Sequence, residues 1–376
     1  MKILLISNMF PNNIAPYYGT FVKKTYDILK NSQDFYIDKL VLYKETGKFK
    51  KAFNYIFFYF KVLLAILFKK YDIIYVHYAS HNSIPILLAH YLKRNIKIIT
   101  NVHGSDVVPE TKIQLMFQNN VKRLLTISKK IIVPSTYFGG LIINKYNVSD
   151  TKIEVSPSGG IDFQIFYPNK NERFHRLSNK DHRYIGYVGR IDFGKGWEDL
   201  IKAFEVIKKD SDYKYLKLAI VGNGKKYDDM VLQVNSSKFK DDIILIDSLP
   251  QENLREIYNS LDLFIFPTKR QGESLGLVGL EAMACGLPVV GSRIGGLLSY
   301  IDDGKNGLLF EPANINELVS RVKEYLKSSE YDKKEYKKNA YNKAMEFNSI
   351  VVEKHFLEIF KKEMVENAPK KKNMSN

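Results

Sequence analysis

The sequence contains a single cysteine, Cys285, among 376 residues. One cysteine excludes an intramolecular disulfide and a metal site built from cysteines, which fits a reducing compartment. The first ten residues, MKILLISNMF, are typical of a strand and have neither the length nor the cleavage site of a signal peptide. The sequence therefore predicts a cytoplasmic protein, and Cys285 is interpreted as a buried thiol.

Metal ligands and long apolar runs are scarce as well. No group of residues has convincing metal-ligand spacing, so no metal is expected. Residues 52–68, AFNYIFFYFKVLLAILF, are apolar, but Asn54 and Lys61 interrupt them, and a membrane-spanning helix needs about 20 mostly apolar residues. The preferred interpretation is an ordinary packed helix. The alternative is an interfacial segment, because lysines flank the run on both sides.

Acidic residues are few in the first half of the chain. The whole sequence has 57 Lys and Arg against 41 Asp and Glu, for a net charge of +16. Residues 1–170 hold 23 basic and 10 acidic residues, so most of the excess lies there. This asymmetry predicts an anionic partner for the first half, either a membrane surface or nucleic acid.

Strand-like runs alternate with helix-length segments along the whole chain. They cover residues 2–7, 38–43, 72–77, 97–103, 130–134 and 152–155, and then 183–190, 216–222, 242–247, 261–267, 288–291 and 307–311. Such alternation predicts parallel sheets covered by helices. We expect an α/β fold of two doubly wound Rossmann-like domains, residues 1–168 and 169–346, with a turn-rich linker at 169–181 and a disordered basic tail at 366–376.

The segment 261–292 holds two carboxylates, Glu273 and Glu281, in an unusual setting. A buried strand is followed by a polar loop and by a short helix, expected from Leu275 to Cys285, in which Glu281 is the only charge. Burying a carboxylate without a partner costs on the order of several kcal/mol. Glu281 therefore needs either an internal Arg or Lys, or the hydroxyl pair of a ligand.

The start of this helix is a candidate anion site. The N–H groups of Gly276, Leu277 and Val278 are expected to point outward and to favour a negative ligand. Glu273 lies in the loop directly before them. The segment thus offers anion-binding amides beside two acids that can accept hydrogen bonds from hydroxyl groups.

Ligands of open parallel sheets bind beyond the carboxyl ends of the strands, so the first strand-to-helix loop of each half is informative. In the second half Arg190 ends a strand and Lys195 precedes a helix, and this pair could bind a diphosphate without a metal. Two solvated surface cations are the alternative. In the first half Gly19 could let backbone approach a phosphate, or could simply permit the turn. His103, at another strand end, is either a structural or a functional residue.

These motifs together resemble the retaining glycosyltransferases of family four, which have the GT-B architecture. They occur in the family's order: HGSD at His103, PSGGIDFQIFYP at Pro157, GRIDFGKG with Arg190 and Lys195, Glu273 with Glu281 eight residues later, and EAMACGLPVV. The resemblance spans nearly the whole chain and is strongest from Val155 to Pro312. Gly19 follows Tyr18 rather than a second glycine, and Ser158-Gly159-Gly160 replaces the commoner Asn-Gly pair.

The resemblance implies two domains that face each other across a crevice, with the acceptor side in the first domain and the nucleotide sugar in the second. The final helix, about residues 347–365, would cross back onto the first domain. Arg190 and Lys195 would hold the donor diphosphate with the amides near Gly276, and Glu281 the ribose hydroxyls. Other contacts implied are these: Glu273, Ser274 and His103 to the donor sugar, Gly19, Leu277 and Val278 to phosphate, and Leu249 to the base.

The resemblance predicts a metal-independent hexosyltransferase that moves a sugar from a nucleoside-diphosphate sugar to an acceptor hydroxyl. His103, Glu273, Arg190 and Lys195 are its expected catalytic residues. The basic first domain favours a sugar or lipid-linked acceptor in surface polysaccharide or glycolipid assembly, and peripheral contact with the inner face of the plasma membrane, rather than nucleic acid. The alternatives are a nucleotide-sugar epimerase of the same architecture and a non-catalytic protein that binds an anionic partner.

Overall fold

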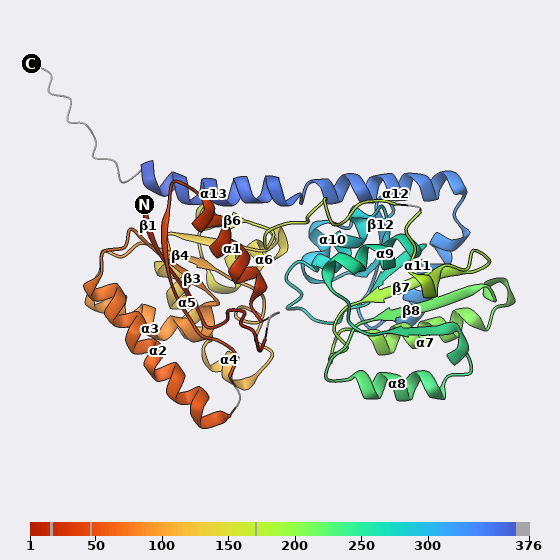
Figure 1. Cartoon of the computed structure of the whole chain (residues 1–376), viewed down its shortest axis with the longest axis horizontal. Helices are drawn as coiled ribbons and strands as arrows, with labels where there is room; N and C mark the ends of the chain where they lie inside the picture. The colour runs from red at the N-terminus through yellow and green to blue at the C-terminus, as the bar shows by residue number, and fades with distance from the viewer. Residues whose placement is uncertain (16–17, 46, 170, 366–376) are drawn as a thin grey trace, which may run out of the picture. The chain divides into compact units, whose positions relative to one another are not determined.

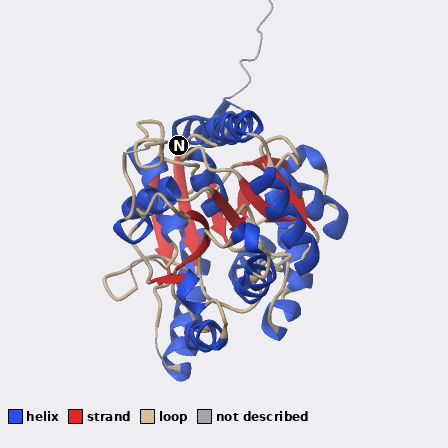
Figure 2. Cartoon of the chain, turned by 90° about the vertical axis from the view of Figure 1, so that its right-hand side faces the viewer, coloured by secondary structure: helices blue, strands red, loops and turns tan. Residues whose placement is uncertain are grey.

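The computed structural model describes residues 1–15, 18–45, 47–169 and 171–365. It divides into two compact units, the first made of Met1–Gly159 with Ile350–Asn376 and the second of Gly160–Ser349. Each unit contains one parallel six-stranded sheet. Helices cover the strands, as Figures 1 and 2 show. The predicted α/β class with two doubly wound domains is confirmed.

Unit 1 has the strand order β2-β1-β3-β4-β5-β6. The chain order reverses between β1 and β3, which makes the carboxyl ends of these strands the place where a doubly wound sheet binds ligands. The strands are β1 Lys2–Ser7, β2 Tyr36–Val41, β3 Ile73–His77, β4 Ile98–Asn101, β5 Lys130–Val133 and β6 Ile153–Val155. The helices are α1 Thr20–Asn31, α2 Lys48–Phe68, α3 Ala79–Leu92, α4 Lys112–Met116, α5 Gln118–Ile127, α6 Thr136–Tyr146 and α13 Ser349–Val365.

Unit 2 has the strand order β12-β11-β10-β7-β8-β9, with the reversal between β7 and β10. The strands are β7 Arg183–Val188, β8 Leu216–Val221, β9 Ile243–Ile246, β10 Leu263–Phe266, β11 Val289–Ser292 and β12 Gly307–Phe310. The helices are α7 Trp197–Lys208, α8 Tyr227–Ser236, α9 Leu254–Ser260, α10 Leu277–Ala284, α11 Ile315–Lys327 and α12 Glu330–Met345. Each strand lies at or within one or two residues of a predicted run.

Successive side chains of each strand enter cores on opposite faces of the sheet. In β1, Leu4 and Ile6 join the core under α2, α3, α5 and α6, while Ile3 and Leu5 join the core under α1 and α13. Successive side chains of a strand point to opposite faces, so a strand covered by helices on both sides is apolar throughout. This is why the strand runs of the sequence are nearly continuous rather than alternating.

The boundary between the units differs from the predicted one. Contacts place residues 160–168 with unit 2, and the segment predicted as a linker, 169–181, also packs there. Leu177 of that segment is fully buried in the unit 2 core, and the Phe174 amide donates to the Ser260 hydroxyl. At the other end, α13 returns to unit 1, where Phe356 and Phe360 enter the core. The tail predicted to be disordered, 366–376, lies outside the described residues.

Residues 158–160 make the first connection between the units. Ser158 has φ 47°, Gly159 φ 90° and Gly160 φ 68°. The left-handed region favours Gly and, among residues with a side chain, Asn. This explains why an Asn-Gly pair is common here and shows that Ser158 carries the same backbone conformation. A Cβ on Gly160 would lie 2.6 Å from the Phe347 carbonyl oxygen, so glycine is needed at this crossing.

Candidate active site

The carboxyl edge of the unit 2 sheet is assembled by backbone contacts that only glycine allows. Gly196, the residue before α7, has φ 79°, and a Cβ there would lie 1.7 Å from the Pro267 carbonyl oxygen. Gly222, after β8, has φ 140°, and its Cβ would lie 1.9 Å from the Gly189 carbonyl oxygen. The loops after β7, β8 and β10 therefore touch one another directly. This packing places Lys195 beside the loop that carries Glu273.

Lys195 and Glu273 form a buried ion pair. The Lys195 ammonium donates to Oε2 of Glu273 at 2.7 Å, and the Thr268 hydroxyl donates to the same oxygen at 3.2 Å. The two side chains are only 12% and 13% exposed. Burial raises the pKa of Glu273, but Lys195, assisted by Arg270 and Thr268, outweighs burial and holds that pKa below its ordinary value. Glu273 is therefore a carboxylate acceptor at neutral pH.

Helix α10 begins directly beyond this pair. Gly276 is its N-cap with φ 81°, no side chain caps the helix, and the Tyr300 hydroxyl donates to the Gly276 carbonyl at 3.1 Å. The amides of Leu277 and Val278 lie in the first turn, where helical N–H groups have no acceptor within the helix. With a Lys195 ammonium close to the adjoining loop, this helix start has the electrostatics of an anion site.

Glu281 is 5% exposed and is held by neutral donors. Gln251 donates to Oε1 at 2.9 Å, and the buried Tyr258 hydroxyl donates to Oε2 at 3.0 Å. Burial and the neighbouring carboxylate of Glu281 raise the pKa of Tyr258 well above its usual value, so the phenol stays a donor. Each carboxylate oxygen has about two acceptor positions, so Glu281 is a hydrogen-bond acceptor at this place in the helix.

Arg190 lies at the end of β7 but not in the buried cluster. Its side chain is 65% exposed and pairs with Asp192 at 2.9 Å within the same loop. Asp192 also accepts from the Lys225 amide at 3.0 Å, which ties the loops after β7 and β8 together. Arg190 is thus a tethered surface cation at the ligand-binding edge of the sheet. Leu249 lies in the loop between β9 and α9, partly buried against the unit 2 core.

The loop after β11 packs directly against the backbone of Glu273 and Ser274. A Cβ on Gly295 would lie 2.6 Å from the Glu273 carbonyl oxygen, and one on Gly296 would lie 2.3 Å from that of Ser274. The Gly296 amide donates to the Glu273 carbonyl at 2.8 Å. This close packing leaves the backbone at Glu273 little freedom.

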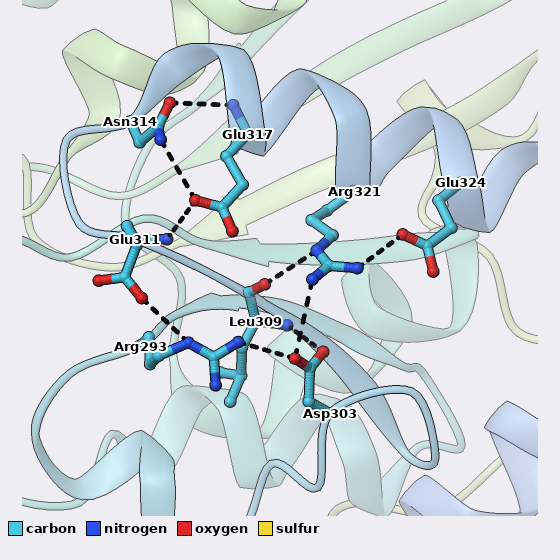
Figure 3. A network of polar contacts seen from close by, with 8 residues as sticks. All are labelled: Arg293, Asp303, Leu309, Glu311, Asn314, Glu317, Arg321 and Glu324. Atoms are coloured by element: carbon cyan, nitrogen blue, oxygen red, sulfur yellow. Dashed lines mark hydrogen bonds and ion pairs between the residues drawn. The ribbon is translucent and has the colours of Figure 1, made fainter.

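A network of charged groups fixes the same loop to the sheet edge (Figure 3). Arg293, directly after β11, pairs with Asp303 at 2.7 Å and with Glu311 at 3.1 Å. Arg321 of α11 donates to the Leu309 carbonyl at 3.1 Å and contacts Asp303 at 3.8 Å. The network anchors residues that lie one or two positions before Gly295, and so holds the support of the site in place.

In unit 1 the carboxyl edge of the sheet presents His103, which rests on a second histidine. Nε2 of His103 lies 2.8 Å from Nδ1 of His77, the last residue of β3, and Nε2 of His77 lies 3.0 Å from the Thr25 hydroxyl. Burial lowers the pKa of His103 to about 3, and burial together with His103 lowers the pKa of His77 well below its usual value. Both imidazoles are therefore neutral at neutral pH.

The tautomers of these histidines follow from the Thr25 proton. The Thr25 hydroxyl donates to the Val22 carbonyl at 3.0 Å, and with its proton placed there it accepts from Nε2 of His77. A neutral His77 with a proton on Nε2 has none on Nδ1, which then accepts from Nε2–H of His103. This chain of hydrogen bonds leaves Nδ1 of His103 without a proton. It can therefore accept a hydrogen bond from a hydroxyl group of a ligand.

Asp106 holds the backbone of the His103 loop. Its Oδ1 accepts from the amides of His103 and Gly104, both at 3.0 Å, and its Oδ2 accepts from the Ala79 amide at 3.0 Å. Burial raises the pKa of Asp106 although these backbone bonds oppose the rise. The aspartate thereby ties the loop after β4 to the start of α3 and fixes where His103 sits.

Gly19 is the N-cap of α1 and has φ 82°. A Cβ there would lie 3.0 Å from the Met9 carbonyl carbon, so packing and turn geometry already account for a glycine. Two residues later, the Phe21 ring lies 4.5 Å from the His103 ring, which places both at one edge of the unit 1 sheet. Among the described residues, no group of three or more His, Cys, Asp or Glu side chains is placed so that it could hold a metal ion.

Two family models cover most of the chain. The one described as Glycosyltransferase Family 4 matches residues 31–163, and the one described as Glycosyl transferases group 1 matches residues 168–343. The chain is a family-four glycosyltransferase. The join between the two matched regions lies within ten residues of the boundary between the two units.

Curated relatives carry related names. N-acetyl-alpha-D-glucosaminyl L-malate synthase of Bacillus anthracis is 26% identical over 264 residues, 69% of this chain and 66% of that protein. The capsular polysaccharide biosynthesis glycosyltransferase CapM of Staphylococcus aureus is 29% identical over 198 residues, 49% of each chain. The matches thus span from about half to just under two thirds of the length of these relatives.

Solved structures show the same fold. Sucrose-phosphate synthase from Thermosynechococcus elongatus superposes with a TM-score of 0.78 at 20% identity, covering 97% of this chain and all of that one. HepE from Anabaena, in complex with UDP-glucose, superposes with a TM-score of 0.73 at 19% identity, covering 96% of this chain and all of that one. The expected GT-B architecture of this family-four glycosyltransferase is confirmed.

The structure brings together some of the residues named from the sequence of this glycosyltransferase. Lys195, Glu273, Ser274 and the start of α10 form one cluster, and Glu281 lies one turn further along the helix. The sequence did not reveal that Tyr258 and Gln251 donate to Glu281, or that His77 contacts His103. Only the strand-end position of His77, shared with His103, was visible as a signal, because the other partners come from separate segments.

Proposed function

We propose that this glycosyltransferase moves a hexose from a nucleoside-diphosphate sugar to an acceptor hydroxyl, with retention at the anomeric carbon and without a metal ion. The observation that carries the proposal is the buried pair of Lys195 and Glu273 next to the start of α10. One site then offers a cation and helix amides for phosphate, and a carboxylate for sugar hydroxyls. Glu281, held at one side by neutral donors, supplies acceptor oxygens for the ribose.

The chemistry follows from where charge develops. Cleavage of the bond between the anomeric carbon and the diphosphate oxygen leaves positive charge on the sugar ring and negative charge on the phosphate. Fixed positive groups aimed at the leaving oxygens lower this barrier. Lys195, Arg190 and the amides of Leu277 and Val278 would do this. The acceptor hydroxyl attacks the same face of the sugar that the diphosphate leaves and passes its proton to a leaving phosphate oxygen.

His103 would bind a hydroxyl group of the donor sugar. Its Nδ1 is the acceptor end of the chain through His77 and Thr25, so it would accept a hydrogen bond from a sugar hydroxyl. A neutral imidazole suits this role, because an imidazolium would repel positive charge on the ring in the transition state. Glu273, a carboxylate, would bind a second sugar hydroxyl.

The proposed biological setting is surface polysaccharide or glycoconjugate assembly. A relative named for capsular polysaccharide biosynthesis supports it, and structures of HepE with UDP and UDP-glucose make a uridine diphosphate sugar the first donor to test.

A mass-spectrometric screen tests the proposal. The purified chain is incubated with uridine and guanosine diphosphate sugars, first alone and then with sugar and lipid-linked acceptors. We expect release of nucleoside diphosphate together with a product heavier than the acceptor by one sugar residue, unaffected by a metal chelator. Conversion of the donor to its epimer without acceptor, resolved by chromatography because the two isomers have equal mass, would instead indicate an epimerase. Binding of oligonucleotides with no response to any donor would indicate a non-catalytic protein.

A further inference from the structure

Three helices of unit 1 form one layer on the sheet. Helices α2, α3 and α5 contribute to the same core, α2 packs on α3, and α3 packs on α5, so α3 lies between the other two. Figure 1 shows α2 along the lower left of unit 1 with α3 beside it. The surfaces of these helices that point away from the sheet therefore form a single face, here called the outer helix face.

Helix α2 is apolar on two opposite sides. One side packs into the unit 1 core through Phe58, Val62, Ala65 and Ile66. The other side carries large apolar residues that are all exposed and recur at helical spacing: Phe49, Phe53, Ile56, Phe57, Phe60, Leu64 and Phe68. The surface side of a helix in a soluble domain is normally polar. Only 17% of the most apolar stretch of α2 is buried, so the packed helix favoured from the sequence describes just one of its sides.

The apolar surface continues on α3. Four of its residues are exposed and again have helical spacing: Ile84, Leu88, Tyr91 and Leu92. Phe53, Phe68 and Tyr91 are 69%, 78% and 71% exposed. Scattered exposed apolar residues are common in proteins, but two parallel stripes on adjoining helices form a contiguous patch, and such patches mark interaction surfaces.

The outer helix face is also one-sided in charge. Helices α2, α3 and α5 contain no Asp or Glu, while Lys50, Lys51, Lys61, Lys69 and Lys70 lie on or next to α2. Lys50 pairs with Glu45 just before the helix. A surface that combines exposed phenylalanines with lysines and lacks acids is complementary to an anionic lipid surface, where rings enter the acyl boundary and ammonium groups remain among phosphates.

A basic pocket lies on the same face, between α3 and α5. It is open, has a volume of about 370 Å³, and its lining includes His90, Arg94, Lys122 and Arg123. Nδ1 of His90 is buried and finds no hydrogen-bond partner among the described residues. Apolar walls from Leu87 and Ile127 complete the pocket. This chemistry fits the phosphate of a lipid headgroup, with its acyl chains directed along the apolar stripes.

The packing of α2 decides between a helix that crosses a membrane and one that lies on it. Helix α2 is long and apolar enough to span by length and composition. However, Tyr59 donates to the His81 carbonyl at 2.8 Å and Lys93 donates to the Ile66 carbonyl at 2.9 Å, which ties α2 to α3. If α2 crossed the bilayer, its core side would lose its packing against the sheet. The structure is therefore that of an interfacial helix.

We propose that the outer helix face docks unit 1 onto an anionic lipid bilayer, with α2 lying in the plane of the interface and the pocket between α3 and α5 holding a lipid phosphate. The inference stands apart from the proposed sugar transfer, because vesicle binding requires no donor. It also gives a direct role to the positive charge of the first half of the chain.

Vesicle co-sedimentation of the full chain tests the proposal. We expect binding to vesicles of phosphatidylcholine mixed with phosphatidylglycerol, weaker binding to phosphatidylcholine alone, and loss of the difference in high salt. The variant Phe53→Ser/Phe57→Ser/Phe60→Ser is expected to bind at least tenfold more weakly to both. Leu232→Ser/Tyr331→Ser, which removes two exposed apolar residues of unit 2, is the matched control and should bind like the wild type.

The variant Arg94→Gln/Lys122→Gln/Arg123→Gln tests the contribution of the basic pocket. This variant is expected to lose at least tenfold in binding to the anionic vesicles and to bind phosphatidylcholine vesicles unchanged. Circular dichroism and thermal unfolding confirm that each variant is folded. If the charge variant binds anionic vesicles like the wild type, the lipid phosphate site is wrong.

Other occupants of the face predict different results. Equal vesicle binding by the wild type and the triple Phe variant would overturn the proposal. Dimers that the Phe variant dissociates, without any vesicle binding, would assign the face to a second copy of the chain. Resistance of the vesicle-bound wild type to alkaline extraction would show that α2 spans the membrane. A chain that binds vesicles but transfers no sugar would contradict the proposed function alone.

Discussion

Nδ1 of His77 and Nε2 of His103 lie 2.8 Å apart, and the two imidazole rings are stacked at 9° to each other. Two buried histidines in contact would repel strongly if both were charged, and burial lowers the pKa of each. The contact is stable only when both rings are neutral and one donates to the other. The strand-end residue His77 is thus a positioning residue that sets which nitrogen His103 presents.

The first prediction concerns the tautomers. ¹⁵N spectra of the histidine-labelled chain at neutral pH should show His77 and His103 both protonated on Nε2 and bare on Nδ1, because the Thr25 proton is committed to Val22. Thr25→Val removes the acceptor for His77, so its tautomer should become mixed while the fold persists. Exposed His175 serves as the reference. A proton on Nδ1 of His103 in the wild type would refute the chain of bonds.

The second prediction concerns stability at acid pH. Because the pKa of His77 and of His103 is lowered in the folded protein, the unfolded chain binds more protons below the ordinary histidine pKa of about 6.5. The stability these residues contribute is complete above that value and is lost as the pH falls toward the lowered pKa.

Thermal unfolding as a function of pH checks this. The midpoint of the wild type should fall more steeply between neutral pH and pH 5 than that of His77→Asn/His103→Gln. The control His175→Asn removes an exposed histidine and should keep the wild-type slope. Parallel pH profiles for all three proteins would show that the two buried histidines already take up protons in the folded state.

The third prediction separates Lys195 from Arg190. Lys195→Met leaves Glu273 buried beside no ammonium, and the loss of a partner from a buried pair costs on the order of 3 kcal/mol. Adding Glu273→Gln should restore most of that stability but not turnover. Arg190→Ala, at an exposed position, should leave stability nearly unchanged. Denaturant unfolding measures these differences.

Turnover is measured on the same variants. Lys195→Met and Arg190→Ala should each lower kcat at least tenfold, which corresponds to a loss of about 1.4 kcal/mol in transition-state stabilisation. Asp192→Asn, which frees Arg190 from its partner without removing the cation, is the matched control and should lose less. Wild-type rates in both cation variants would contradict the assignment of the diphosphate site.

The fourth prediction concerns Glu281. In Glu281→Gln the amide oxygen can still accept from Tyr258 while Gln251 rotates its amide, so the fold should survive. A neutral amide is a poorer acceptor for two ribose hydroxyls, and affinity for the nucleoside diphosphate should fall about tenfold, roughly 1.4 kcal/mol. Calorimetric titration with uridine diphosphate and with the free pyrophosphate measures it.

The pyrophosphate is the internal control, because it lacks the ribose and should bind Glu281→Gln like the wild type. Tyr258→Phe removes a donor to Glu281 but not the carboxylate, and should weaken binding less. If Glu281→Gln unfolds while the remaining folded fraction binds nucleotide normally, Glu281 is a structural residue of the core.

Much of the architecture was predictable because it follows from the pattern of neighbouring residues in the sequence. Most strands of the two sheets coincide with an apolar run, because a parallel strand covered on both faces must be apolar throughout. The edge strands β2 and β6 are only partly buried and carry charged residues. Glu273 and Glu281 stood out for the same reason, as charges in apolar surroundings.

The predicted boundary, after residue 168, lies nine residues beyond the observed one, because the turn-rich composition of residues 169–181 is typical of a linker. Phe174 and Leu177 pack into unit 2 only through contacts with segments far away in sequence, such as Ser260. No local pattern reports a contact of that kind. The partners of Glu281 were missed for the same reason, since Gln251 and Tyr258 come from another loop and helix.

The sequence by itself determined the alternation of strands and helices, the polar groups at strand ends and the scarcity of acids in the first half, because each is a property of neighbouring residues. Only the tertiary structure decided that Lys195 pairs with Glu273, that neutral donors hold Glu281, that His77 orients His103, and that one side of α2 remains uncovered. These depend on which elements pack together, and packing is set by long-range burial of apolar surface rather than by local order.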